Sequence, residues 1–228
     1  MEYDIQLYDK LLELPLFQGM SRNDLTSIVA HTKLGFHKFQ PNHDIVQEGD
    51  TSDCLYFLLS GVISVYTSAD DHGYTFCEEI SAPEALQPER IFGLTQRYTH
   101  TYKTKTVCNF ITLDKYEVLK LSDKFSIFRF SLLNMICTLS QKASHQSWRI
   151  QPKDLRGRII RFFETHCIRP AGKKIVHIKM IRLAEEVNDS RINVSHVLNQ
   201  LESENLIQLS RSVISIPVFE KLMIKGEF

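Results

Sequence analysis

The sequence predicts an α+β protein with three consecutive parts: antiparallel β-structure flanked by helices, one long helix, and a C-terminal pair of short helices followed by a hairpin. Short runs of β-branched and aromatic residues, separated by turn residues, begin after Lys33 and indicate strands. No Pro or Gly interrupts Ser122–Ile150, which favours one long helix. Helical spacing returns in Ile178–Ile207 and breaks once, at Asn188-Asp189-Ser190. The predicted domains are 1–121, 122–151 and 152–228.

Composition and charge are those of a folded protein with room for one large or two ordinary domains. The 228 residues are 43% hydrophobic and 24% charged, as in globular chains. No run approaches the roughly 18 apolar residues of a membrane span, and residues 1–10 are too acidic and polar for a signal peptide. We therefore expect a cytoplasmic protein with no membrane partner. Residues 151–228 carry 13 Lys and Arg against 9 Asp and Glu, whereas residues 1–150 carry 14 against 18; the C-terminal part has the sign that suits a phosphate backbone.

Cysteine and histidine spacing predicts no metal or cofactor site. The five cysteines lie 23 to 31 residues apart, without the close pairs of a zinc or iron–sulfur site, so we expect isolated reduced thiols. His72 and Cys77 lie near each other in an expected hairpin, but a lone His or Cys in a strand is far more often a packing residue than a haem ligand. The sequence also lacks a glycine elbow and a phosphate loop, so we predict no cofactor, neither haem nor iron–sulfur, and no enzymatic activity. The cysteines are Cys54, Cys77, Cys108, Cys137 and Cys167.

Ile178–Ile207 predicts a helix, a tight turn and a second helix. Asp189 or Ser190 can cap the second helix, because a short side-chain oxygen accepts from the N–H groups of the first turn. The runs around Ser210-Arg211-Ser212 predict a hairpin directly afterwards. An ordinary helical hairpin with a solvated face gives the same helical spacing, but the strands that follow favour a helix-turn-helix with a wing. The apolar residues at helical spacing in the first helix are Ile181, Ala184 and Val187, and the residues of the second helix expected to pack inward are Val194, Val197, Leu198 and Leu201.

The stretch LAEEVNDSRINVSHVLNQLESENLI and its hairpin resemble the DNA-binding domain of the Crp/Fnr superfamily of bacterial transcription regulators. The matching positions are Ser190, Arg191, Val194, Ser195, Leu198, Leu201, Glu202, Leu206 and Ile207. The chain departs from the family at Ile192, where many members have a base-reading Glu, and at His196, where many have Arg, so the usual target sequence is not carried over. The resemblance implies a winged helix-turn-helix whose second helix enters the major groove. The candidate DNA contacts are Ser190, Arg191, Ile192, Ser195, His196, Asn199 and Arg211.

Leu14–Tyr66 also resembles this superfamily. The sequences LPLF and QEGDTSDCLYFLLSGVISVY look like the start of its cyclic-nucleotide-binding β-roll, an antiparallel, jelly-roll-like double-stranded β-helix. Two helices are expected before it, at Tyr3–Leu14 and, after the cap Ser21, at Arg22–His31. Strands are expected at His43–Gln47, Leu55–Leu59 and Val62–Tyr66. Together the two resemblances imply a bacterial regulator with an N-terminal sensor domain.

The ligand-binding signature of the family is altered. Members that bind a cyclic nucleotide have Phe-Gly-Glu, whose acid holds the ribose hydroxyl, and about ten residues later Arg-Ser or Arg-Thr for the phosphate. Here the turn is Phe92-Gly93-Leu94, and Tyr98-Thr99 stands nearest the second motif, with Arg97 as a weak substitute. A buried phosphate without its arginine is poorly compensated, so a cyclic nucleotide, and cAMP above all, is disfavoured. Leu94 and Tyr98 are expected to fill the pocket, or another effector occupies it. The candidate pocket residues are Gly93, Leu94, Arg97, Tyr98, Thr99, Ala143 and Ser144.

The long helix carries a stripe suited to pairing with a second copy of itself. In the family this helix forms the dimer interface, and a homodimer suits a two-fold symmetric operator in double-stranded DNA; RNA polymerase is the further partner implied. Phe128, Leu133 and Met135 are expected instead to pack on their own β-structure. Gln151-Pro152 should end the helix. Two rival interpretations stay open: a ligand-independent or protein-triggered regulator with a degenerate sensor, and a small-molecule-binding module that does not bind DNA. The predicted seam is Phe125, Leu132, Ile136, Leu139, Ala143 and Ile150.

Overall fold

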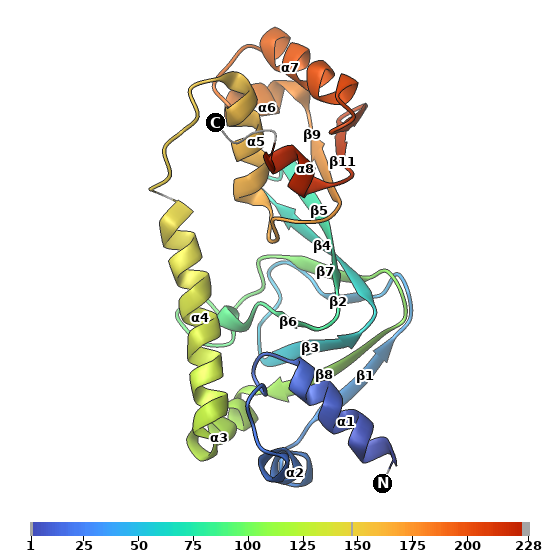
Figure 1. The fold of residues 1–228 in the computed structure, drawn as a ribbon, viewed down its shortest axis with the longest axis vertical. Helices are drawn as coiled ribbons and strands as arrows, with labels where there is room; N and C mark the ends of the chain where they lie inside the picture. The colour runs from blue at the N-terminus through green and yellow to red at the C-terminus, as the bar shows by residue number, and fades with distance from the viewer. Residues whose placement is uncertain (1, 147, 225–228) are drawn as a thin grey trace. The chain divides into compact units, whose positions relative to one another are not determined.

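The computed structural model describes residues 2–146 and 148–224, with side chains from Tyr8 onward (Figure 1). The chain divides into two compact units, the first built from residues 1–63 and 80–147 and the second from residues 64–79 and 148–228. Within the described residues, no helix is both long and apolar enough to cross a membrane. By this division, residues 64–79 belong to the second unit, although the sequence prediction placed them in the sensor domain.

The first unit combines short antiparallel strands with helices at both ends of its sequence. The chain leaves the first unit along β4 (Val62–Ser68) and returns to it along β5 (Tyr74–Ser81). The other elements are α1 (Glu2–Glu13), α2 (Arg22–His31), β1 (Gly35–Phe39), β2 (Asp44–Val46), β3 (Cys54–Ser60), β6 (Glu84–Leu86), the 3₁₀ helix η1 (Pro88–Arg90), β7 (Thr101–Thr104), β8 (Cys108–Asp114), α3 (Lys115–Lys124) and α4 (Ser126–Gln146).

A four-stranded sheet in the order β1-β8-β3-β6, with every neighbour antiparallel, forms the centre of the first unit. β2 pairs antiparallel with β7 at one end of a second sheet. Aromatic side chains join the helices to the sheet: the Phe17 ring lies 6.0 Å from that of Phe57 on β3 and 5.5 Å from that of Phe128 on α4. Ser21 caps α2 in a reciprocal capping box with Asp24. The predicted N-terminal helices and strands are present at these positions.

The prediction of one helix over 122–150 is wrong. α3 ends at Lys124, where the extended backbone of Phe125 (φ −121°, ψ 105°) separates it from α4. Phe125 is drawn into the core of the first unit and is only 9% exposed, which shows that core packing can break a helix without Pro or Gly. α4 extends only to Gln146, and Ile150 lies outside any helix.

The second unit packs helices on the sheet β10-β11-β9-β5-β4. Its core includes the fully buried Phe163, Val176 and Leu198 together with Phe76 of β5. Asp154 caps the first of its helices, accepting from the Gly157 N–H at 2.8 Å. The elements are α5 (Leu155–His166), β9 (Lys174–Ile178), α6 (Met180–Glu186), α7 (Arg191–Ser203), β10 (Gln208–Ser210), β11 (Val213–Ile216) and α8 (Phe219–Ile224).

The β4–β5 hairpin is an integral part of the second unit. β5 pairs antiparallel with β9, from Tyr74 opposite Ile178 to Glu78 opposite Lys174. Glu78 is 1% exposed and accepts hydrogen bonds from the Lys174 Nζ at 2.5 Å, from the Ile168 N–H at 2.6 Å and from the Arg169 N–H at 3.2 Å. A charge buried this deeply needs such partners. The hairpin is thus fixed to the loop between α5 and β9.

Candidate nucleic-acid interface

The turn between α6 and α7 is stabilised by the backbone conformation of Asn188 and by the Asp189 carboxylate. Asn188 adopts a left-handed conformation (φ 51°), which Asn tolerates better than most residues. Ser190 caps α7, its Oγ accepting from the Asn193 N–H at 3.2 Å. Of the two cap candidates, the structure therefore selects Ser190.

Asp189 fixes the start of α7 relative to α5. It accepts from the Asn193 side-chain amide and the Ser190 N–H, both at 2.8 Å, and from the Arg158 guanidinium at 2.5 Å. The hydrogen bond from Asn193, followed by that from Ser190, lowers the pKa of Asp189, and the nearby Arg158 acts in the same direction. The same Arg158 side chain donates to the Val187 carbonyl at 3.0 Å, so α5 supports both sides of the turn.

α7 has one fully buried face and one exposed face. Val194, Leu198 and Leu201 are 0% exposed and pack into the core of the second unit. The predicted contacts lie on the other side: Ser190, Arg191, Ile192, His196 and Asn199 are exposed and Ser195 is half-buried. The structure thus brings these six residues onto one short stretch of helix surface.

The β10–β11 hairpin carries the seventh predicted contact. Arg211 and Ser212 form its turn, both exposed, and Ser212 has a positive φ of 58°. The Glu202 carboxylate of α7 accepts from the Leu209 N–H at 2.7 Å, which ties the hairpin to the helix. Arg211 is therefore presented on a turn that is anchored to α7.

The predicted ligand segment is closed by its own side chains. Buried Gln87 pairs with Thr99 twice: its Nε2 donates to Thr99 Oγ1 at 2.6 Å, and the Thr99 N–H donates to its Oε1 at 3.0 Å. Tyr98 is 2% exposed and donates from its hydroxyl to the Cys54 carbonyl at 2.9 Å. The expectation for Tyr98 is met, and Gln87 is a residue that the sequence reasoning missed.

The other candidate pocket residues are exposed. Leu94 does not fill the pocket but is 104% exposed, because it follows the turn at Gly93 (φ +97°) on the surface. Ala143 and Ser144 are exposed on α4. Arg97 is exposed and donates to the Gly49 carbonyl at 2.7 Å. Of the predicted set, only Tyr98 is buried and Thr99 half-buried.

The two residues beside Thr99 carry no positive charge at pH 7. Burial raises the pKa of Tyr98 to about 12, so its hydroxyl is neutral at pH 7. Burial, reinforced by Arg90, lowers the pKa of His100 to about 4, so the imidazole is neutral as well. Neither residue beside Thr99 can compensate a phosphate.

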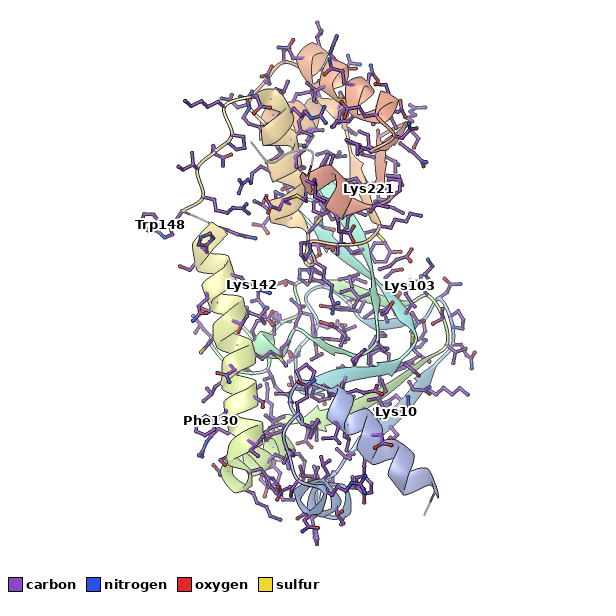
Figure 2. All side chains as sticks on the ribbon, in the orientation of Figure 1. Lys10, Lys103, Phe130, Lys142, Trp148 and Lys221 are labelled. Carbon is purple, nitrogen blue, oxygen red and sulfur yellow. The ribbon has the colours of Figure 1, made fainter. Side chains whose placement is uncertain are left out.

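The predicted seam on α4 is largely wrong. Leu132, like Phe125, is buried in the core of the first unit, and Ile136 packs against the same core; Ile150 is not in the helix. Leu133, expected to pack inward, is 50% exposed, because it lies on the face opposite the buried one. Figure 2 shows Phe130 projecting from α4 on the side away from the strands. One series of exposed positions with alternating spacings of three and four is Phe130, Leu133, Cys137, Ser140 and Ser144.

Cysteine and histidine residues do not converge. All five cysteines are free thiols, and no group of three or more His, Cys, Asp or Glu residues that could hold a metal occurs in the described part of the chain. His72 lies in the tight turn between β4 and β5 with φ 54°, and Cys77 is half-buried on β5.

Comparison with known proteins finds a family match for part of the chain and solved structures with the same fold. Residues 36–125 match the family model of the cyclic nucleotide-binding domain. The Thermus thermophilus catabolite activator protein aligns with a TM-score of 0.51 at 16% identity, over 93% of this chain and 97% of that one. The chain has the fold of the Crp/Fnr regulators. The c-di-GMP-responsive global regulator CLP of Xanthomonas campestris gives 0.52 at 16% identity, over 86% and 99% of the chains. The sensor domain of the transcriptional regulator DNR of Pseudomonas aeruginosa gives 0.53 at 16% identity, over 68% and 99%.

Curated relatives of this chain share only a short region with it. The human potassium/sodium hyperpolarization-activated cyclic nucleotide-gated channel 4 is 40% identical over 57 residues, which are 25% of this chain and 5% of the channel. The potassium channel SKOR of Arabidopsis thaliana is 30% identical over 120 residues, or 50% of this chain and 13% of the channel. The chain therefore spans a small fraction of these relatives.

Proposed function

We propose that this Crp/Fnr-like chain is a sequence-specific DNA-binding transcription regulator that acts as a homodimer and reads DNA with α7 of a winged helix-turn-helix. The observation that carries the proposal is the two-faced α7: Val194, Leu198 and Leu201 anchor it, while the exposed face presents Arg191, His196 and Asn199. A capped, rigidly seated helix with a polar outer face is what major-groove reading requires. The solved structures with this fold include named transcription regulators, which supports the assignment.

The roles follow from side-chain chemistry. Arg191 is the base reader, because its two-pronged guanidinium matches the guanine edge. Ser195 and His196 lie on the same face of α7 and can hydrogen-bond to a phosphate or to a base edge. Arg211, on the anchored hairpin turn, suits the DNA backbone. A two-fold symmetric operator and RNA polymerase are then the expected partners.

Binding to duplex DNA should weaken steeply with salt, because phosphate contacts release counterions. We expect a labelled random-sequence duplex to bind at about 50 mM salt and to be largely released at about 200 mM. Arg211→Ala should reduce the slope of log affinity against log salt by about 1 per subunit. Fluorescence anisotropy titrations measure both effects.

Lys38→Ala is the matched control, since Lys38 is an exposed cation on β1 of the first unit and should leave the slope unchanged. Absence of duplex binding at low salt would contradict the proposal.

We propose that the homodimer forms through the exposed face of α4, with Phe130 and Leu133 at its apolar end. The spacings of three and four place Phe130, Leu133 and Cys137 on one seam of a parallel pair. In such a pair equivalent core positions face each other across the two-fold axis, so Cys137 should lie opposite its counterpart.

Mild oxidation should therefore link two chains through Cys137, because facing residues of a parallel pair approach the distance that a disulfide needs. We expect a covalent dimer in the wild type and none in Cys137→Ser. Non-reducing electrophoresis reads the product, and Cys54→Ser is the control that should still cross-link. Leu133→Glu should shift the protein toward monomer in light scattering. A wild type that is monomeric at all concentrations tested would refute this interface.

A nucleotide-independent sensor domain is the second candidate, and the Gln87–Thr99 pair favours it. The Thr99 N–H, the backbone donor nearest the family's phosphate position, is already bonded to Gln87 Oε1, and the Thr99 hydroxyl accepts from Gln87 Nε2. Neutral Tyr98 and His100 flank them. We propose that a cyclic nucleotide is not the effector and that the β-roll acts as a scaffold, responds to another ligand, or is triggered by a protein.

The melting temperature of the wild type should accordingly not change with about 1 mM cAMP or cGMP, because any ligand that binds only the native state must raise it. Differential scanning fluorimetry gives the answer. Gln87→Ala, which frees the Thr99 N–H, is the matched variant, and a nucleotide-dependent rise confined to this variant would support the role of the amide. A rise of several degrees in the wild type would refute the candidate.

A further inference from the structure

Ile192 is the most exposed apolar side chain on α7. It occupies the second position of the helix and is 80% exposed. A single exposed isoleucine says little by itself, since isolated apolar side chains are common on protein surfaces. Its place in the first turn, directly after Arg191, puts it where residues of a reading helix meet base edges.

The polar groups around Ile192 are already engaged. The Asn193 side-chain amide donates to Asp189 at 2.8 Å, and the Asn193 N–H donates to Ser190 Oγ at 3.2 Å. Ser190 and Asn193 therefore serve the cap and the turn. In the first turn of α7 this leaves Arg191 as a cation and Ile192 as an apolar surface.

An apolar side chain in the major groove can recognise only one feature of the bases. The methyl group at C5 of thymine is the apolar feature that distinguishes base pairs there, and 5-methylcytosine carries the same group at the same position. An isoleucine cannot accept or donate a hydrogen bond, so it cannot tell the polar edges apart.

Given the DNA-reading function proposed above, we infer that Ile192 makes this chain read a pyrimidine C5-methyl group next to the base contacted by Arg191. The family's acidic base reader is thus replaced by a methyl reader, which changes the kind of operator that the protein selects. Loss of the methyl contact should cost about fourfold in affinity per half-site, the value of one buried methylene-sized group.

The test uses the full chain and the best duplex selected from a random pool. At each pyrimidine of the half-site, four duplexes are compared by anisotropy: thymine against uracil, and 5-methylcytosine against cytosine. Each comparison removes only the methyl group, and together they separate the two sources of it. We expect one position at which thymine binds about fourfold more tightly per half-site than uracil.

Ile192→Ala should erase that difference, because the variant has lost the contact that distinguishes the thymine duplex from the uracil duplex. Ile181→Ala is the matched control, because Ile181 is also an exposed isoleucine, 61% exposed on α6, and should keep the methyl preference. If 5-methylcytosine but not thymine is preferred over its unmethylated partner, the target is a methylated site. DNA binding without any methyl-sensitive position, or a methyl effect that survives in Ile192→Ala, overturns the inference alone; failure to bind any duplex overturns the proposed function with it.

Discussion

Glu78→Ala is expected to destabilise the second unit by about 3–5 kcal/mol, the cost of leaving one member of a buried ion pair uncompensated. Lys174 is 1% exposed. The Glu78 carboxylate accepts hydrogen bonds from the Lys174 Nζ and from two backbone N–H groups of the loop after α5. Without the carboxylate, the ammonium and both N–H groups lose their partner in the interior. Chemical denaturation followed by circular dichroism measures the loss.

The neighbouring residue provides the control. Glu79 is exposed on the same strand, so Glu79→Ala should change the free energy of unfolding by less than about 0.5 kcal/mol. Adding Lys174→Met to Glu78→Ala should recover part of the stability, since the unpaired charge is then gone. Equal stabilities for Glu78→Ala and Glu79→Ala would show that the buried pair does not hold the hairpin.

Arg191→Ala is expected to weaken binding to the selected duplex by about 1–3 kcal/mol per half-site and to relax one base position. The side chain is exposed in the first turn of α7 and no fold contact depends on it, so the free energy of unfolding should not change. Arg191→Lys keeps the charge but loses the two-pronged geometry, and should keep non-specific binding while losing base discrimination. Anisotropy titrations on the best site and on single-base variants measure both.

Arg169→Ala controls for the loss of a positive charge, because Arg169 is an exposed arginine of the same unit outside α7. It should leave discrimination at every base position intact. Wild-type affinity and specificity in Arg191→Ala would show that Arg191 does not contact the bases.

Local patterns predicted α7 and its cap well because the determinants are close in sequence. Ser190 caps the helix through Asn193, three residues away, and the inward positions Val194, Leu198 and Leu201 follow helical spacing. The same holds for α2 and its capping box. Such contacts depend on neighbours along the chain, which a single sequence displays.

Contacts between distant segments were not predictable in this way. The Glu78–Lys174 pair joins residues 96 positions apart, and the sequence gives no sign that a hairpin of the first half completes the sheet of the second. Gln87 and Thr99 are brought together by a loop, and no periodic pattern in the sequence predicts the conformation of that loop. On α4 the apolar stripe was real, but Leu132 faces the core and Leu133 the surface; adjacent apolar residues could not be assigned to a face without the fold.

The most direct test of DNA reading is selection of sites from a random duplex pool by the purified protein without added effector, with Arg191→Ala in parallel. The account predicts enrichment of a two-fold symmetric site by the wild type, with a methyl-bearing pyrimidine in each half, and loss of that enrichment in the variant. No enrichment by the wild type, with or without cell metabolites, would contradict it.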